Sequence, residues 1–232
     1  MCRRFVMLEW DEVLQILHRI EMNVPLGADE EWPARDIDVY PGSEVPVIAA
    51  ACTEGETSRP SVDTADKRRG TLAPVRLRWG IEAPWDARKL LFNTRIETAL
   101  APGGGIWSDA FRTGRCIVPT LGFFESSETE TVASPRTGKA VKAQYRFAAP
   151  EGLTLLAGVR EQDAFSVVTT EPNEQVAPVH GRMPLVLRAG EALQWLFGDA
   201  AALADRSGIA LDVNAETPRT ASGPASSQLA LF

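Results

Sequence analysis

The chain has 232 residues, enough for one substantial domain or a domain with a tail, and its 44% hydrophobic content can build a real core. Its formal charge of −7 argues against nucleic acid as a partner, because polyanion binding draws its affinity from cationic side chains. Apolar stretches fall short of the roughly 18 residues of a membrane span, and no apolar signal region follows the charged start, so we expect a cytoplasmic protein with no membrane partner.

The predicted elements begin with an amphipathic helix over residues 9–22, where Val13, Leu17 and Ile20 share one face. Residues 39–48 are predicted as a turn and a short strand, and residues 52–70 as an exposed polar loop. Short apolar runs broken by Pro and Gly then have the spacing of strands. They cover residues 72–79, 116–118, 145–147, 153–159 and 165–169.

The polar segment 126–139 is predicted as a hairpin loop, and residues 191–197 as a helix. After Asp199 the composition changes to Ala, Ser, Thr and Pro with few large apolar residues. That change is typical of a flexible tail.

The negative average charge conceals a local reversal. Between Lys67 and Arg115 there are ten Lys or Arg against four Asp or Glu, a difference of +6. This segment has the cations that a nucleic-acid surface requires, although a solvated face has the same composition.

The cysteines exclude two kinds of structural site. Three cysteines at wide spacing, with two histidines in the chain, fit neither a disulfide framework nor a structural zinc site. We therefore expect no metal and no cofactor, and Cys52 and Cys116 are predicted to be ordinary buried thiols.

Cys2 can carry out a specific reaction at the start of the chain. If Met1 is removed, Cys2 presents a free α-amine and a thiol, and this pair condenses with aldehydes through an imine to a thiazolidine ring. The α-amino pKa lies near 7.7 to 8.0, so a useful fraction is nucleophilic at cellular pH. The alternative for an isolated Cys2 is a small residue at the start of a strand.

Further blocks occur downstream, in a fixed order. The set is Met1-Cys2-x-Arg4-Phe5, Trp79-Gly80-Ile81 to Pro84-Trp85, Asn93-x-Arg95-x-Glu97-Thr98-Ala99, Arg115-Cys116-Ile117-Val118-Pro119 leading to Gly122-Phe123-Phe124-Glu125, Thr169-Thr170-Glu171, and His180-x-Arg182-Met183-Pro184. Together they resemble the SOS-response-associated peptidase family, the SRAP domain, from Cys2 to about Phe197.

The resemblance and the strand signals together imply an α+β fold with a mostly antiparallel, barrel-like β core and peripheral helices. The expected organisation is an SRAP-like domain over residues 1–199, a flexible tail over 200–227 and a terminal peptide over 228–232.

The resemblance also implies a sensor of abasic sites in single-stranded DNA. In that family the N-terminal cysteine captures the ring-opened aldehyde, and the crosslink shields the lesion. By position, Cys2 would be the nucleophile, Asn93 would orient the sugar, and Glu125 and His180 would move protons, roles that suit a carboxylic acid and an imidazole. Such a protein would be monomeric and associated with the nucleoid.

The same resemblance implies a DNA-contacting set, in which arginines hold phosphates flanking the lesion. The predicted set is Arg3, Arg4, Arg95, Arg182 and Thr169.

Several of these residues also have structural interpretations. Asn93 could cap a turn, and Glu97 could pair internally with Arg95 or Arg115, which is the role we favour for Glu97. Arg182 and Met183 could lie at the edge of the core. Trp79 and Trp85 are predicted to pack.

The chain departs from the family pattern at two positions. Arg3 replaces the usual Gly after the cysteine, where it could add a phosphate contact or crowd the site. Ser126 replaces the Trp that follows the glutamate, so the aromatic that would wedge against exposed bases is missing, and another side chain could substitute.

The C-terminus carries a second signal. Gln228, Leu229, Leu231 and Phe232 resemble the bacterial sliding-clamp-binding peptide Gln-Leu-x-Leu-Phe, in which Gln hydrogen-bonds and the apolar residues fill a pocket. We predict clamp binding, with chance as the alternative for so short a pattern.

Two other functions stay open. Cys2 could act as the nucleophile of a peptidase that removes its own Met1 or cleaves other peptides, with His180 and Glu125 as base and orienter. Alternatively, the chain could be a diverged DNA-binding or clamp-docking module without crosslinking activity.

Overall fold

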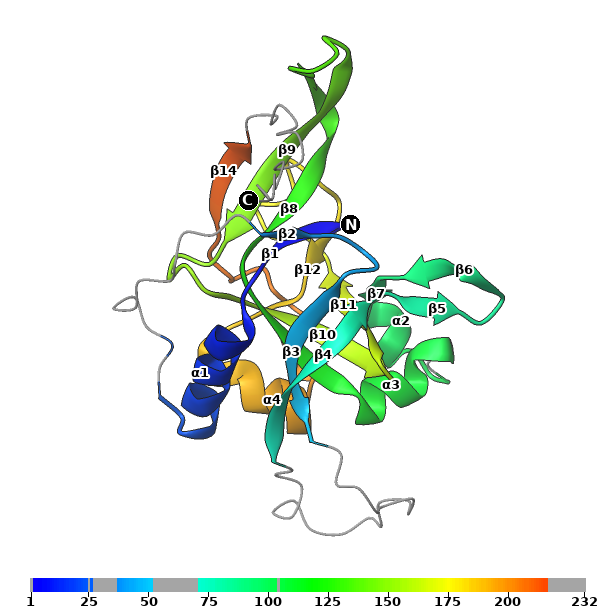
Figure 1. Ribbon diagram of the computed structural model, residues 1–232, viewed down its shortest axis with the longest axis vertical. Coiled ribbons are helices and arrows are strands. Elements are labelled where there is room, and N and C mark those ends of the chain that lie inside the picture. Colours follow the sequence, from blue (N-terminus) through cyan, green and yellow to red (C-terminus); the bar gives the residue numbers. More distant parts are fainter. Residues whose placement is uncertain (1, 25, 27–36, 52–70, 104, 217–232) are drawn as a thin grey trace, which may run out of the picture.

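The computed structural model describes residues 2–24, 26, 37–51, 71–103 and 105–216 (Figure 1). The predicted loop 52–70, residues 217–227 and the peptide 228–232 lie outside the described residues.

Strands dominate the described part of the chain. The strands are β1 (Arg4–Met7), β2 (Asp38–Val39), β3 (Glu44–Ala50), β4 (Leu72–Trp79), β5 (Ile81–Ala83), β6 (Asp86–Leu91), β7 (Asn93–Arg95), β8 (Arg115–Ala133), β9 (Ala140–Ala148), β10 (Thr154–Glu161), β11 (Ala164–Thr170), β12 (Met183–Pro184), β13 (Val186–Leu187) and β14 (Asp212–Glu216). The α-helices are α1 (Trp10–Glu21), α2 (Ile96–Leu100), α3 (Ser108–Thr113) and α4 (Ala192–Phe197), and short 3-10 helices cover Gly105–Trp107, Ala189–Glu191 and Ala201–Leu203.

Five strands close into a barrel. The sheet runs from β10 through β11, β4 and β3 to β8, and β8 pairs again with β10 over residues 115–120. Strand β11 runs parallel to β4 and β7, whereas the other pairings among the described residues are antiparallel. The predicted α+β fold with a mostly antiparallel, barrel-like core is confirmed.

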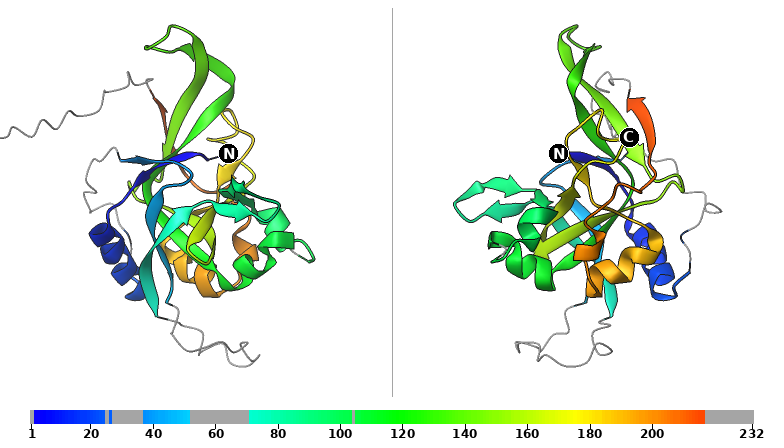
Figure 2. Two further views of the ribbon diagram at one scale, coloured as in Figure 1. Left: turned by 45° about the vertical axis from the view of Figure 1, so that its right-hand side comes forward. Right: turned by 180° about the vertical axis from the view of Figure 1, so that it is seen from behind.

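The strands alternate between two apolar clusters, as period-2 geometry requires. On β3, Val45 and Val47 belong to one cluster and Ile48 belongs to the other. The cluster with Ile48 also contains the buried faces of the four helices, which lie around the barrel in Figure 2. The other cluster contains Cys2 and Trp79, so the start of the chain is part of the core.

Helix α1 forms where its apolar pattern predicts it. Val13, Ile16, Leu17 and Ile20 are buried, and the Glu12 carboxylate accepts a hydrogen bond from the backbone N–H of Glu9 at 2.6 Å. That contact satisfies one donor at the helix start. Among the described residues, no helix has the length and apolarity needed to cross a bilayer.

The predicted hairpin loop over residues 126–139 is wrong in extent. Strand β8 continues to Ala133 and pairs with β9, so the turn itself is confined to residues 134–139. The two strands form an arm that projects at the top of Figure 1. Its side chains are mostly exposed on both faces, which explains why its sequence resembles that of a loop.

The flexible tail predicted from residue 200 onward is also wrong for residues 200–216. Strand β14 pairs with β9 in register Asp212↔Ala148 to Glu216↔Gln144. Before it, the buried Arg206 pairs with Glu191 at 2.7 Å, and Thr170 donates a 2.6 Å hydrogen bond to the carbonyl of Ala204. These residues therefore belong to the folded domain.

Of the two tryptophans that were expected to pack, one is buried and the other is exposed. Trp79 is fully buried, 4.6 Å from the ring of Phe5, and its indole N–H donates to the carbonyl of Phe92 at 2.9 Å. Trp85 lies at the tip of the β5–β6 hairpin with 64% of its surface exposed, so the packing prediction is wrong for Trp85.

Candidate functional site

Cys2 lies beside Glu125 because β1 pairs with β8 in the register Arg4↔Phe124 and Phe5↔Phe123. The thiol is fully buried and donates a 3.5 Å hydrogen bond to the carbonyl of Arg4. Burial, together with the Glu125 carboxylate, raises the pKa of the Cys2 thiol far above its usual range. Cys2 is thus a neutral thiol held in the core, not a standing thiolate.

Asn93 fixes the backbone at Cys2. Its side-chain N–H donates a 2.8 Å hydrogen bond to the carbonyl of Cys2. Strand β7 is itself aligned by parallel pairing, with Asn93 opposite Val167 on β11. Asn93 Oδ1 is buried and has no hydrogen-bond partner among the described residues, so one acceptor at this site is unsatisfied.

Glu125 is a buried carboxyl. Only 2% of the residue is exposed, and burial raises the pKa of Glu125 from 4.5 to about 7. A carboxyl with this pKa exchanges protons near neutral pH, as a general acid requires.

His180 lies on the loop between β11 and β12. In the tautomer whose Nδ1–H donates to the carbonyl of Arg182 at 3.1 Å, Nε2 of His180 is the nitrogen that takes up a proton. Nε2 lies 3.5 Å from a carboxylate oxygen of Glu128. Burial lowers the pKa of His180 below its usual value, while Glu128 raises it.

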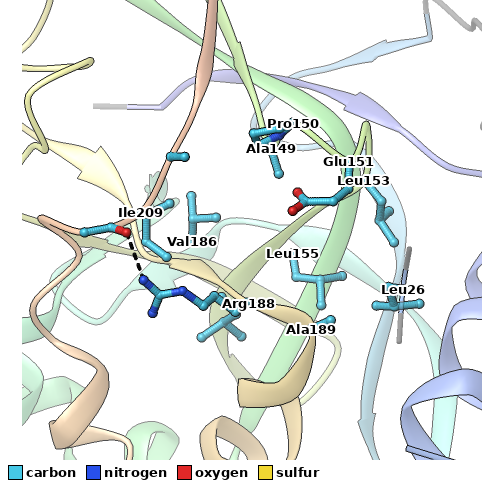
Figure 3. A pocket seen from close by; sticks show the side chains of 13 residues that line it. Leu26, Ala149, Pro150, Glu151, Leu153, Leu155, Val186, Arg188, Ala189 and Ile209 are labelled. Atoms are coloured by element: carbon cyan, nitrogen blue, oxygen red, sulfur yellow. Dashed lines mark hydrogen bonds between the residues drawn. The ribbon is translucent and has the colours of Figure 1, made fainter. Parts of the chain in front are cut away.

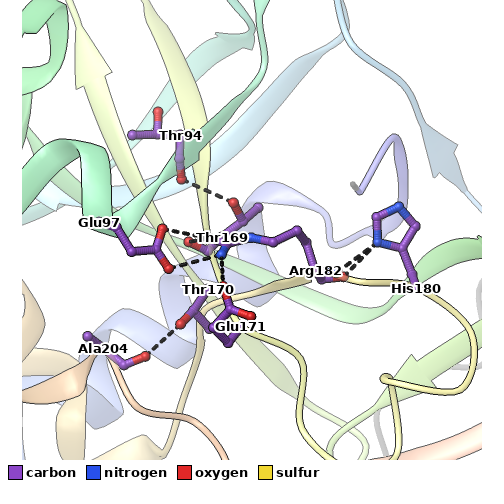
Figure 4. Close-up of polar contacts among 8 residues, drawn as sticks. All are labelled: Thr94, Glu97, Thr169, Thr170, Glu171, His180, Arg182 and Ala204. Atoms are coloured by element: carbon purple, nitrogen blue, oxygen red, sulfur yellow. Dashed lines mark hydrogen bonds and ion pairs between the residues drawn. The ribbon is translucent and has the colours of Figure 1, made fainter.

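Arg182 is the centre of an ion-pair cluster (Figure 4). Its guanidinium donates to both carboxylate oxygens of Glu97 at 2.9 Å, to Glu171 at 2.6 Å and to the carbonyl of Thr169 at 3.0 Å. The side chain is 11% exposed. Glu97 therefore pairs internally, but with Arg182 and not with the predicted Arg95 or Arg115. Burial opposes its ionisation, yet Arg182 holds the pKa of Glu97 below its usual value.

Arg4 is likewise engaged within the protein. It pairs with Asp38 at 2.6 Å, contacts both carboxylate oxygens of Glu216, and lies 3.8 Å above the ring of Phe124. Two carboxylates already neutralise this cation, so the structure gives Arg4 the role of anchoring β1 to β2 and β14. Its predicted role in phosphate binding is not visible in this arrangement.

The other three residues predicted to contact DNA differ in their exposure to solvent. Arg3 and Arg95 are exposed, and Arg3 lies 5.8 Å from the ring centre of Phe92. Thr169 is fully buried, and its hydroxyl donates to the carbonyl of Thr94 at 3.3 Å, as Figure 4 shows. The Thr169 hydroxyl is therefore engaged within the protein, and DNA contact by Thr169 stays a prediction.

The buried-thiol prediction is confirmed for Cys116, and Cys52 lies outside the described residues. In the described ranges, no group of three or more His, Cys, Asp or Glu side chains is placed to hold a metal ion.

Figure 3 shows a pocket of about 290 Å³ that Cys2 does not line. Leu155, Val186 and Ile209 give it apolar walls, and Arg188 at its edge donates to the carbonyl of Gly208 at 2.9 Å. Its lining includes none of Cys2, Asn93, Glu125 and His180, so we assign it no part in their chemistry.

The sequence profile of the family described as SOS response associated peptidase (SRAP) matches residues 1–219. This chain belongs to the SRAP family. The match extends past the 199 residues expected for the domain and agrees with the folded position of β14.

Characterised relatives of this SRAP chain are similar to it at modest identity. Abasic site processing protein YoaM of Bacillus subtilis is 28% identical over 138 residues, which is 52% of this chain and 55% of YoaM. Abasic site processing protein YedK of Escherichia coli is 28% identical over 118 residues, 51% of this chain and 52% of YedK. The alignments thus span about half the length of these two relatives. Abasic site processing protein YoqW of B. subtilis is 25% identical over 84% of this chain and 80% of YoqW.

Solved structures show the same fold at low identity. A crystal structure of a protein from Bordetella bronchiseptica has a TM-score of 0.59 at 18% identity, covering 93% of this chain and 100% of that one. One from Bacteroides thetaiotaomicron has a TM-score of 0.58 at 18% identity, covering 92% and 91%.

Sequence reasoning missed Glu128 as a neighbour of His180 and the exposure of Trp85. Glu128 faces His180 across 3.5 Å, and Trp85 is exposed on a hairpin whose second strand carries the exposed Arg88 and Lys89. The polar run around Glu128 gave no periodic signal, whereas the position of Trp85 directly after a Pro was a sign of a turn.

Proposed function

We propose that this SRAP chain captures the ring-opened abasic site of single-stranded DNA as a covalent thiazolidine on Cys2. The observation that carries the proposal is the arrangement around Cys2, with the Asn93 amide on its carbonyl and the buried Glu125 beside it. The three similar proteins named as abasic site processing proteins support the substrate class.

The chemistry requires removal of Met1. While the Met1–Cys2 peptide bond is intact, the nitrogen of Cys2 is an amide and cannot form an imine. After removal, the amine adds to the aldehyde, and the resulting carbinolamine loses water once its hydroxyl is protonated. The thiol then adds to the imine carbon and its proton passes to nitrogen, so one amine, one thiol and one aldehyde give one thiazolidine and one water.

Glu125 and His180 suit the two proton transfers. A carboxyl with a pKa of about 7 can donate to the departing hydroxyl near neutral pH. His180 can accept the ammonium proton on Nε2 in the tautomer whose Nδ1–H donates to the carbonyl of Arg182. The high pKa of the thiol agrees with attack by the amine before the sulfur, since a buried neutral thiol is a poor nucleophile.

The DNA surface we propose consists of exposed cations and one exposed aromatic side chain. Arg3 directly follows Cys2, and Arg95 lies two residues after Asn93. Trp85 can stack on a base in place of the aromatic absent at Ser126. Arg182 and Arg4 join this surface only if a phosphate displaces a carboxylate from them, because both are already paired.

The experiment compares mature protein on single strands with and without an abasic site, resolved on denaturing gels. A retarded band that requires the lesion and disappears in Cys2→Ser supports capture. Insertion of Gly between Met1 and Cys2 provides a matched control, because the thiol remains but no α-amine is adjacent to it. Binding without a covalent band would favour the non-covalent module, and peptide cleavage without a band would favour the peptidase.

The second component of the proposal is docking of residues 228–232 on the replicative sliding clamp, which would bring the domain to replicating DNA. The tethered position of Gln228, Leu229, Leu231 and Phe232 after a polar segment supports it. Deleting residues 228–232 should abolish clamp pull-down and leave crosslinking unchanged, and retained pull-down would refute the assignment.

A further inference from the structure

Glu128 is held against the loop of His180 by a local distortion of β8. The register between β8 and β9 shifts between Ser126 and Thr131, so the residues between them leave the regular ladder. The buried Ser127 hydroxyl accepts hydrogen bonds from the backbone N–H groups of Thr129 at 3.3 Å and Glu130 at 2.9 Å. These two hydrogen bonds hold the backbone of the bulge in one conformation.

The bulge is also docked on the loop itself. The backbone N–H of Glu128 donates to the carbonyl of Val179 at 3.0 Å, one residue before His180. This bond places the Glu128 carboxylate 3.5 Å from Nε2 of His180. That separation is too long for a strong hydrogen bond but short enough for a charge to act on the ring.

The other face of the imidazole is already occupied. Nδ1 lies 3.1 Å from the carbonyl oxygen of Arg182, and in the tautomer whose Nδ1–H donates to that carbonyl the proton that His180 gains or loses is on Nε2, the nitrogen that faces Glu128. We infer that Glu128 is a positioning residue for His180, which stabilises the imidazolium formed when Nε2 takes up a proton.

In the reaction, which rests on the proposed function, the Cys2 ammonium loses a proton to Nε2 of His180. The positive charge then lies on the ring beside the Glu128 carboxylate until the proton is passed on. No electrons are transferred and no further reactant is needed. Glu128 itself gains no proton and touches no reacting atom.

Other charges act on the same ring and fix the expected sign. Burial, the α-amino group of the chain and Lys142 on β9 lower the pKa of His180, whereas Glu128 and the backbone hydrogen bond to Arg182 raise it. Glu128 also raises the pKa of Glu125. Removing the Glu128 charge should therefore move the titration of both groups to lower pH.

The test measures His180 by nuclear magnetic resonance and crosslinking in the same proteins. The chain has two histidines, and His18 lies exposed on α1, so His18→Gln leaves His180 as the single imidazole signal. Glu128→Gln removes the charge and keeps an acceptor. Glu130→Gln is the matched control, since it removes the same charge from the same bulge. Glu130 accepts a hydrogen bond from the Tyr145 hydroxyl and does not pair with His180.

We expect the His180 titration midpoint to fall in Glu128→Gln and to stay in place in Glu130→Gln. The crosslinking rate near neutral pH should fall about two- to five-fold in Glu128→Gln, the range of a half-exposed ion pair, with the pH profile moving in the same direction. Both effects should shrink in high salt.

Equal midpoints in Glu128→Gln and Glu130→Gln would overturn the inference, even if both proteins form crosslinks. If neither these variants nor the parent forms crosslinks while the midpoint still moves, the proposed function fails and the coupling of Glu128 to His180 stands.

Discussion

The side-chain amide of Asn93 donates a 2.8 Å hydrogen bond to the backbone carbonyl of Cys2, which ties the start of the chain to a strand 91 residues later. Asn93 belongs to β7, which lies parallel to β11, so the position of Cys2 depends on the central sheet and not on local structure.

Asn93→Asp should slow crosslinking by about ten- to a hundred-fold, because an ionised carboxylate cannot donate to the Cys2 carbonyl and the amine is no longer held in place. Affinity for single-stranded DNA should change much less than the rate. Single-turnover crosslinking and anisotropy measure the two separately. An unchanged rate would show that this hydrogen bond has no part in positioning Cys2.

Glu125 links the site to stability. Its pKa is raised from 4.5 in the unfolded chain to about 7 in the folded protein, so the stability it contributes is fully present below about pH 4.5 and is lost as the pH rises through about 7. The difference corresponds to roughly 3 kcal/mol at most. Glu125→Gln resembles the protonated state and should be more stable than the parent at about pH 8, and equally stable at about pH 4.

Denaturant unfolding of both proteins at the two pH values tests this prediction. An equal difference at both pH values would mean that burial of the charge is not the cause. Crosslinking should be impaired in Glu125→Gln at both pH values.

Much of the site was predictable because its chemistry depends on residue type and order. Cys2, Asn93 and Glu125 were expected to meet, and the strand pairings bring them together. The strand predicted over 72–79 is confirmed as β4, and the helix predicted over 191–197 is confirmed as α4 within one residue. Each of these elements has a strong apolar pattern.

The predictions that were wrong concern segments without such a pattern. Strand β14 is largely exposed and is fixed by backbone hydrogen bonds to β9, so its side chains do not alternate between apolar and polar. Glu216, one partner of Arg4, lies 212 residues away along the chain, and Glu97, one partner of Arg182, lies 85 residues away. A sequence pattern identifies a cation but does not show which carboxylate the fold places beside it.

Arg95 and Arg182 should therefore behave differently. Arg95→Ala removes an exposed cation and should weaken single-strand binding, lower its salt slope by about one, and leave thermal stability unchanged. Arg182→Ala leaves Glu97 and Glu171 without their cation and should cost about 1 to 3 kcal/mol of folding free energy.

Salt-dependent binding and thermal unfolding of both variants measure the difference. If Arg182→Ala keeps full stability and loses the same affinity as Arg95→Ala, its carboxylate cluster is not a structural anchor.

Trp85→Ala should weaken binding to single-stranded DNA by about 1 to 3 kcal/mol, because the exposed ring is available for base stacking. The melting temperature should not change, since the side chain contributes little to the core. Trp85→Phe should restore most of the affinity. Equal affinity of the Ala variant and the parent would remove Trp85 from the DNA surface.

The measurement that tests the central claim most directly is the mass of the product formed on a single strand with one abasic site. Protein that lacks Met1 should gain the mass of the strand minus one water, with the new bonds on the nitrogen and sulfur of Cys2. No adduct, or an adduct of equal yield with Cys2→Ser, would contradict capture by this residue.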